Sequence, residues 1–159
     1  MRFVVMAAAL LALAACGFRP MYGPSSEAAL IGPVQVAEID GRTGHTLRLE
    51  LTRLFGAEAN RGGAARALEV TLSEQVSRLG YRIDESAQRA DLIVIASYRL
   101  ITPGQPDLTG RLSTTVGFDI PDSAFGEITA QDDARDRAGE VLAQQLRTEL
   151  ALRLSAAQP

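Results

Sequence analysis

The chain has 159 residues, of which 47% are hydrophobic, 22% are charged and 5% are aromatic. This composition is typical of one globular domain and excludes a wholly disordered chain. All 16 basic residues are arginine and the net charge is −3, which disfavours a nucleic-acid-binding protein because that function needs a basic patch. With one Cys and one His, the chain lacks the residues for an internal disulfide or a Cys/His zinc site.

The N-terminal segment has the pattern of a secretory signal peptide. Arg2 precedes an apolar run over residues 3–15, which is too short to cross a bilayer that takes about 20 helical residues. The run ends in the order leucine, alanine, alanine, cysteine at Leu13 to Cys16, followed by Gly17. This order resembles the lipobox of bacterial lipoproteins, in which the cysteine is acylated and becomes the first residue of the mature chain. We therefore expect Cys16 to be lipidated.

This pattern predicts three regions along the chain. Residues 1–15 are the lipoprotein signal peptide, and residues 16–32 are a lipidated, Pro- and Gly-rich tether. Residues 33–157 are a single domain that faces the periplasm. Two or more acyl chains anchor a protein stably. We therefore expect the mature chain to be held at a membrane, and the absence of Asp after Cys16 favours the outer membrane by resemblance.

Hydrophobic periodicity predicts the elements of the domain, since strands repeat every two residues and helices every three to four. The expected elements are, in chain order, a short strand at 34–39, a helix at 43–56, a loop at 57–65, a strand at 67–83, a turn at 84–90, a central strand at 92–100, a break at 103–106, a strand at 108–120 and a helix at about 131–155. Together they predict an α+β fold, with two helices packed on one face of a roughly four-stranded sheet, a two-layer sandwich.

The two helices carry end signals of their own. Thr43 or Thr46 can cap the first helix and Gly56 can end it. In the last helix, Thr129 followed by Asp132 is similar to a capping box.

Charge and periodicity also orient the last helix. Asp132, Asp133 and Asp136 would lie near its start, where the helix dipole favours anions, and Glu149 with Arg153 is a favourable i,i+4 pair. Apolar residues at helical spacing predict its core face: Ala134, Ala138, Val141, Leu142, Leu146 and Leu150.

Catalytic chemistry is poorly represented. His45, the only imidazole, lies beside no nucleophile motif, so a surface or capping role is favoured. Asp132 and Asp133 point to different helix faces, which disfavours a catalytic carboxylate pair. The Gly-Gly step at 62–63 lacks the lysine of a phosphate loop. We therefore predict no enzyme activity, no cofactor and no metal site.

Arginines in the predicted strands are the remaining candidate binding groups. Arginine suits bidentate phosphate binding. The alternative is a solvated strand surface in which these arginines pair with nearby acids. The arginines are Arg78, Arg82, Arg99 and Arg111, and the acids are Glu69, Glu74, Asp84 and Glu85.

Residues 16–23 have the sequence CGFRPMYG. Together with later segments, this start resembles the LptE family of lipopolysaccharide-assembly lipoproteins, whose alphaproteobacterial members commonly have CGFRPLYG at this place. The Leu-rich helix at 42–55 lies where the family has its first helix. Residues 118–125, followed by 133–138, resemble the family's final strand and the start of its long last helix.

The resemblance implies a fold and a set of partners. The fold is two helices on a mostly four-stranded sheet. The function is that of a non-enzymatic subunit that plugs the lumen of the outer-membrane β-barrel LptD, assists its assembly and helps to place lipopolysaccharide in the outer leaflet. A generic periplasmic adaptor lipoprotein with another client is the alternative.

Of the family's functional residues, only Cys16 carries over to this chain. Family members bind lipopolysaccharide through basic residues that often include Lys, and this chain has none. Because the lumen wall of a barrel is polar, Arg82, Arg99 and Arg111 are the candidate contacts to the barrel or to lipopolysaccharide.

Overall fold

The computed structural model describes residues 31–59, 66–81 and 87–157. The predicted signal peptide, Cys16 and nearly all of the predicted tether lie outside the described residues. The elements are, in chain order, β1 (Val34–Val36), α3 (Gly41–Ala59), β2 (Arg66–Tyr81), β3 (Ala87–Ile101), β4 (Leu108–Asp119) and α4 (Ala124–Ala156).

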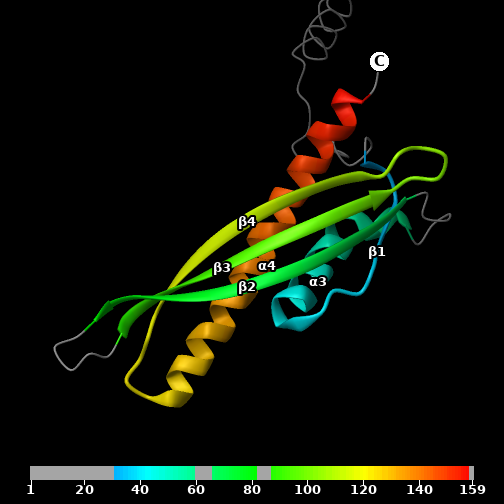
Figure 1. The fold of residues 1–159 in the computed structure, drawn as a ribbon. Coiled ribbons are helices and arrows are strands. Elements are labelled where there is room, and N and C mark those ends of the chain that lie inside the picture. The colour runs from blue at the N-terminus through cyan, green and yellow to red at the C-terminus, as the bar shows by residue number, and fades with distance from the viewer. Residues whose placement is uncertain (1–30, 60–65, 82–86, 158–159) are drawn as a thin grey trace, which may run out of the picture.

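The strands form one mixed sheet in the order β1-β2-β3-β4. β1 runs parallel to β2, and the other neighbouring strands are antiparallel. β3 lies between β2 and β4 (Figure 1), which confirms the central strand predicted at residues 92–100. Its continuous apolar run fits this place, because a central strand has neighbours on both edges.

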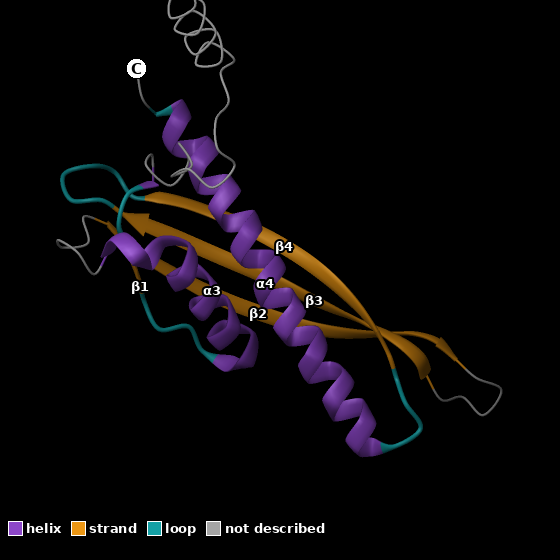
Figure 2. Ribbon diagram, turned by 180° about the vertical axis from the view of Figure 1, so that it is seen from behind, coloured by secondary structure: helices purple, strands orange, loops and turns teal. Residues whose placement is uncertain are grey.

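Both helices cover the same face of the sheet and leave the other face open (Figures 1 and 2). This arrangement confirms the predicted α+β two-layer sandwich. Side chains alternate along β2, so that Leu68 and Val70 are buried toward the helices while Thr71 is exposed on the open face. The two-residue period of a strand therefore separates the core face of the sheet from the open face.

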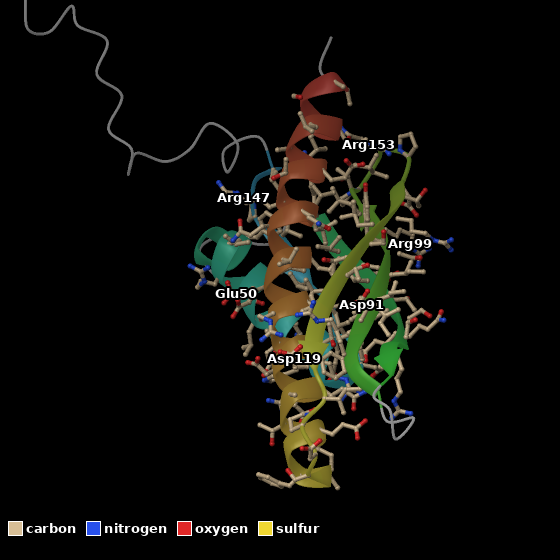
Figure 3. All side chains as sticks on the ribbon, turned by 90° about the vertical axis from the view of Figure 1, so that its left-hand side faces the viewer. Glu50, Asp91, Arg99, Asp119, Arg147 and Arg153 are labelled. Carbon is tan, nitrogen blue, oxygen red and sulfur yellow. The ribbon has the colours of Figure 1, made fainter. Side chains whose placement is uncertain are left out.

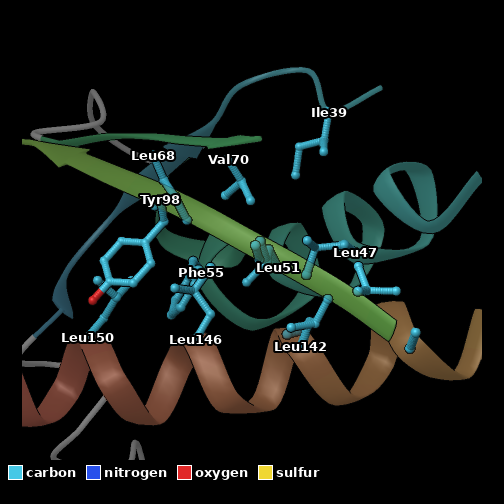
Figure 4. Close-up of a cluster of buried hydrophobic side chains, with 14 of the residues drawn as sticks. Ile39, Leu47, Leu51, Phe55, Leu68, Val70, Tyr98, Leu142, Leu146 and Leu150 are labelled. Atoms are coloured by element: carbon cyan, nitrogen blue, oxygen red, sulfur yellow. The ribbon is translucent and has the colours of Figure 1, made fainter. Parts of the chain in front are cut away.

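The core lies between the sheet and the two helices (Figure 4). The predicted apolar face of the last helix is buried, with the exception of Val141, whose exposed fraction is 42%. Val141 was therefore wrongly assigned, because it lies at the margin of the apolar stripe. The principal core residues are Leu47, Leu51, Phe55, Leu68, Val70, Leu92, Val94, Tyr98, Leu142, Leu146 and Leu150.

The last helix begins earlier than predicted. It starts at Ala124, and the Ser123 hydroxyl caps it by accepting a hydrogen bond from the Gly126 N–H at 3.1 Å. Thr129 lies inside the helix and donates its hydroxyl to the Phe125 carbonyl, so the predicted capping box is wrong. Ser123 takes the capping role because the helix starts directly after the turn that follows β4.

The early start also overturns the predicted role of three acids. Asp132, Asp133 and Asp136 lie more than two turns inside α4, beyond the first turn in which the helix dipole acts. They pair with arginines instead. Asp136 accepts hydrogen bonds from Arg42 of α3 at 2.7 and 3.2 Å, so it joins the two helices.

The first helix is longer than predicted at both ends. It begins at Gly41, whose positive φ of 83° suits glycine at the turn into the helix. Thr43 lies inside the helix and its buried hydroxyl has no hydrogen-bond partner among the described residues, so it is not the cap. Gly56 does not end the helix, which continues to Ala59 and shortens the predicted loop.

Two predicted strand and turn boundaries also shift. β1 ends at Val36, although buried Ile39 follows in the linker to α3. β3 begins at Ala87, so the turn predicted at 84–90 is too long. Antiparallel pairing with β2 extends the strand into a polar segment that has no strand signal of its own.

Candidate functional site

Two of the three candidate arginines lie on the open face of the sheet. Arg99 is in β3 and Arg111 is in β4, and both are exposed. The register pairs Arg99 with Thr109 and Ser97 with Arg111, so the arginines are diagonal neighbours, with Cα atoms ~7–8 Å apart. Figure 3 shows Arg99 pointing away from the helices. Arg82 and Cys16 lie outside the described residues.

The face around these arginines is rich in hydroxyl groups. Its side chains come from alternate residues of β2, β3 and β4, because successive residues of a strand point to opposite faces. Isoleucines of β3 form a half-buried line along the middle of the face. The uncharged polar side chains of this face are Thr71, Ser73, Gln75, Ser77, Ser97, Thr109, Ser113 and Thr115.

The two arginines differ in charge compensation. Arg99 donates to Glu69 on β2, with Nη2 and Oε2 2.5 Å apart, and its Nη1 lies 3.9 Å from Asp107. The hydrogen bond to Glu69 raises the pKa of the Arg99 guanidinium. Arg111 forms no ion pair with any described residue. Among the described arginines of this face, Arg111 is therefore the one without a carboxylate partner.

Of the arginines and acids named in the alternative, the described residues show one pair on the open face, between Arg99 and Glu69. Arg89 and Asp119 form a second pair on this face, at 3.3 Å, which was not predicted. Arg78 points to the helix side of the sheet, where it pairs with Glu127 of α4 at 2.8 Å. Glu74 pairs with Arg135 of α4 at 3.0 Å rather than with a strand arginine. These contacts tie the sheet to the last helix and are structural.

The described residues contain no group of His, Cys, Asp and Glu that could hold a metal ion. His45 lies exposed on α3, and the nearby Asp136 is engaged with Arg42 and Thr46. In the same residues, no helix is both long and apolar enough to cross a membrane.

Sequence reasoning missed a hollow at the edge of the sheet. A cavity of about 330 Å³ lies where the chain leaves β1, between the linker to α3 and the outer edge of β2. The only sequence signal was Asp40-Gly41, which was interpreted as the end of a longer strand. Because that strand was expected to continue to Ile39, the open edge of β2 could not be anticipated. The cavity is lined by Ala37, Glu38, Asp40, Glu69, Val70, Thr71 and Leu72.

Comparison with known proteins identifies a family and a fold. Residues 31–153 match the family model of LptE, described as lipopolysaccharide-assembly. No curated protein matches the sequence significantly. A crystal structure of a protein from Caulobacter crescentus CB15 is 28% identical, with a TM-score of 0.65 over 85% of this chain and 99% of that one.

Two more distant structures share the fold. A minor lipoprotein from Acinetobacter baumannii is 11% identical, with a TM-score of 0.57 over 77% of this chain and 92% of that one. Rare lipoprotein B from Shewanella oneidensis is 16% identical, with a TM-score of 0.50 over 76% of this chain and 97% of that one. At these identities the likeness concerns the arrangement of helices and strands.

Proposed function

Because the chain belongs to the LptE family of non-enzymatic lipopolysaccharide-assembly lipoproteins, we propose that it works as the plug of an outer-membrane LptD-type β-barrel. In this role it assists assembly of the barrel and helps to deliver lipopolysaccharide to the outer leaflet. The observation that carries the proposal is the open sheet face, on which Arg111 is an uncompensated cation among hydroxyl groups.

The chemistry of this face suits a barrel lumen. Lumen-facing residues of a barrel are polar, because they alternate along each strand with the residues that face lipid. A plug therefore needs a surface that offers many hydrogen-bond donors and acceptors, and the serines and threonines around Arg111 provide both. The half-buried isoleucines of β3 lie between them and leave little apolar surface to solvent.

The same face suits the phosphates of lipopolysaccharide. A guanidinium binds phosphate through two parallel N–H groups, and such charge-assisted hydrogen bonds are stronger than neutral ones. Arg111 can make these bonds without losing an ion pair to a described residue, whereas Arg99 must first break its hydrogen bond to Glu69. We therefore assign the larger contribution to Arg111 and a smaller one to Arg99, with Arg82 as a further contact.

The anchor completes the proposal. Acylation of Cys16 would hold the domain at the periplasmic side of the outer membrane, since two or more acyl chains bind a bilayer stably. The tether would then let the domain reach the barrel lumen.

Charge reversal of the open face tests the proposal. The mature lipoprotein is co-expressed with its barrel, and the amount of barrel recovered and the binding of purified lipopolysaccharide are measured. Arg111→Glu should lower the recovery of the barrel, the affinity for lipopolysaccharide, or both, about tenfold. This is the effect expected from losing a charge-assisted hydrogen bond of ~1.5–3 kcal/mol. Triple reversal at Arg82, Arg99 and Arg111 should weaken it further.

Arg48→Glu is the matched control, because Arg48 is an exposed arginine of α3 that has no ion pair with a described residue. It carries the same charge change on the helix layer and should leave both measurements as in the wild type. If Arg111→Glu and the triple variant also behave like the wild type, the open face is a solvated surface and does not carry the function.

A further inference from the structure

Among the described residues, nothing pairs with the outer edge of β2 along most of its length. β1 pairs with β2 only from Val34 to Val36, and the last backbone bond to β2 runs from the Ala37 N–H to the Leu68 carbonyl at 2.9 Å. The chain then turns away toward α3, while β2 continues to Tyr81. Within the described part of the chain, the place in the sheet beside β2 is thus occupied for a few residues and then vacant.

The backbone groups at this vacant place can be identified from strand geometry. In a strand, the N–H and C=O of one residue point to the same side, and those of the next residue point to the other. Since Leu68 bonds toward β1, the groups of Val70, Leu72 and Glu74 also point to the outer edge. No backbone group of the described residues pairs with them there.

The cavity of about 330 Å³ lies at the start of this open edge. Ala37, Val70 and Leu72 give its lining an apolar part, and Val70 is 7% exposed. Glu38 and Asp40 form its acidic rim, are both exposed, and make no ion pair with a described residue. An extended peptide could pair with β2 here and meet both carboxylates.

We propose that this edge binds an extended basic segment of the barrel partner, which adds a strand to the sheet beside β2. The inference rests on the proposed function, because the barrel is its partner. Strand addition uses main-chain hydrogen bonds for affinity and alternate side-chain positions for specificity. In the segment, arginine or lysine side chains face Glu38 and Asp40, and the alternate side chains are small and apolar to fit against Val70 and Leu72.

The opposite edge of the sheet is less suitable for strand addition. α4 packs against β4, and its C-terminal part extends past that strand (Figures 1 and 2). A strand added beside β4 would meet the helix, whereas the edge of β2 borders the hollow.

Hydrogen exchange and charge reversal on the full mature lipoprotein test the inference. The lipoprotein is purified alone and with its barrel, and exchange is measured in both. In the complex the amides of Val70 and Leu72 should exchange at least about tenfold more slowly, because they gain hydrogen-bond acceptors. Glu38→Lys combined with Asp40→Asn should lower barrel recovery several-fold. Asparagine is used at position 40 because that residue directly precedes α3, and asparagine and aspartate are about equally favoured at the position before a helix.

The control combines Glu140→Lys with Asp133→Asn, two exposed positions of α4 that give the same change in charge. This variant should recover the barrel like the wild type, and thermal unfolding should show that both variants fold. One outcome is that the wild type recovers the barrel while the exchange of the Val70 and Leu72 amides is not slowed and the variant with Glu38→Lys and Asp40→Asn recovers as much barrel. This result would refute the strand-addition site and leave the proposed function standing. If the wild type recovers no barrel, both are refuted.

Discussion

Replacing Leu142 by alanine should remove a large part of the stability of the fold. Leu142 lies in the middle of α4 with 1% of its surface exposed. Figure 4 shows its side chain pointing toward Leu47 and Leu51 of α3. Leu152, on the same helix, is 62% exposed and provides a matched control with the same substitution.

The magnitude follows from the burial. The substitution removes about three methylene equivalents at ~0.8 kcal/mol each, or ~2.4 kcal/mol of transfer free energy. The cavity left between α4 and α3 adds to this, so the expected loss is about 3 kcal/mol, within the range of buried Leu→Ala changes. Leu152→Ala should change the free energy of unfolding by less than ~0.5 kcal/mol. Since both changes affect helix propensity alike, their difference reports burial alone.

Urea unfolding of the purified mature protein is the measurement. Leu142→Ala should lower the midpoint without changing the slope, because the surface exposed on unfolding is almost the same. Leu142→Asp should abolish cooperative unfolding, because it places an unpaired charge in the core. If Leu142→Ala costs less than ~1 kcal/mol, or no more than Leu152→Ala, then this side of α4 does not form the core and the assignment of the layers is wrong.

Three further predictions concern the helix contact, its ion pair and the anchor. Gly139→Val should lower the melting temperature by several degrees, because a Cβ there would lie 3.0 Å from backbone atoms of α3. Overpacking of this kind costs ~1–3 kcal/mol. An unchanged melting temperature would show that the helices can separate freely. The hydrogen bond from Arg42 lowers the pKa of Asp136, so its stabilisation is complete above the unfolded-state pKa of about 4 and is lost as the pH falls through the lower folded-state value. The stability difference between wild type and Asp136→Asn should therefore be present at pH 7 and vanish in strong acid, and a difference independent of pH would contradict this origin. For the anchor, the intact mass of the mature protein should exceed that of unmodified residues 16–159 by the mass of the acyl groups on Cys16, and a mass without this increment would refute lipidation.

The sequence alone determined the class of fold and the side of each element that is buried. In β2 the alternation of Leu68 and Val70 with polar residues marks the core face, because side chains of a strand point alternately to its two faces. In α4 the spacing of Leu142, Leu146 and Leu150 does the same at the helical period. Burial of apolar surface decides both patterns, and this local rule is readable without knowing the partners.

The i,i+4 pair of Glu149 with Arg153 was predicted from the sequence and is present at 2.9 Å, but only the tertiary structure decided which charges pair between distant segments and which edge is open. Asp136 meets Arg42, which is far away in the sequence, and Glu69 meets Arg99 because the register of β2 and β3 places them opposite each other. The same register leaves Arg111 without an ion pair among the described residues. Likewise, β1 ends at Val36, where the chain turns toward α3, so no described residue pairs with most of the outer edge of β2. Such pairings depend on contacts between distant segments, whose geometry no local periodicity encodes.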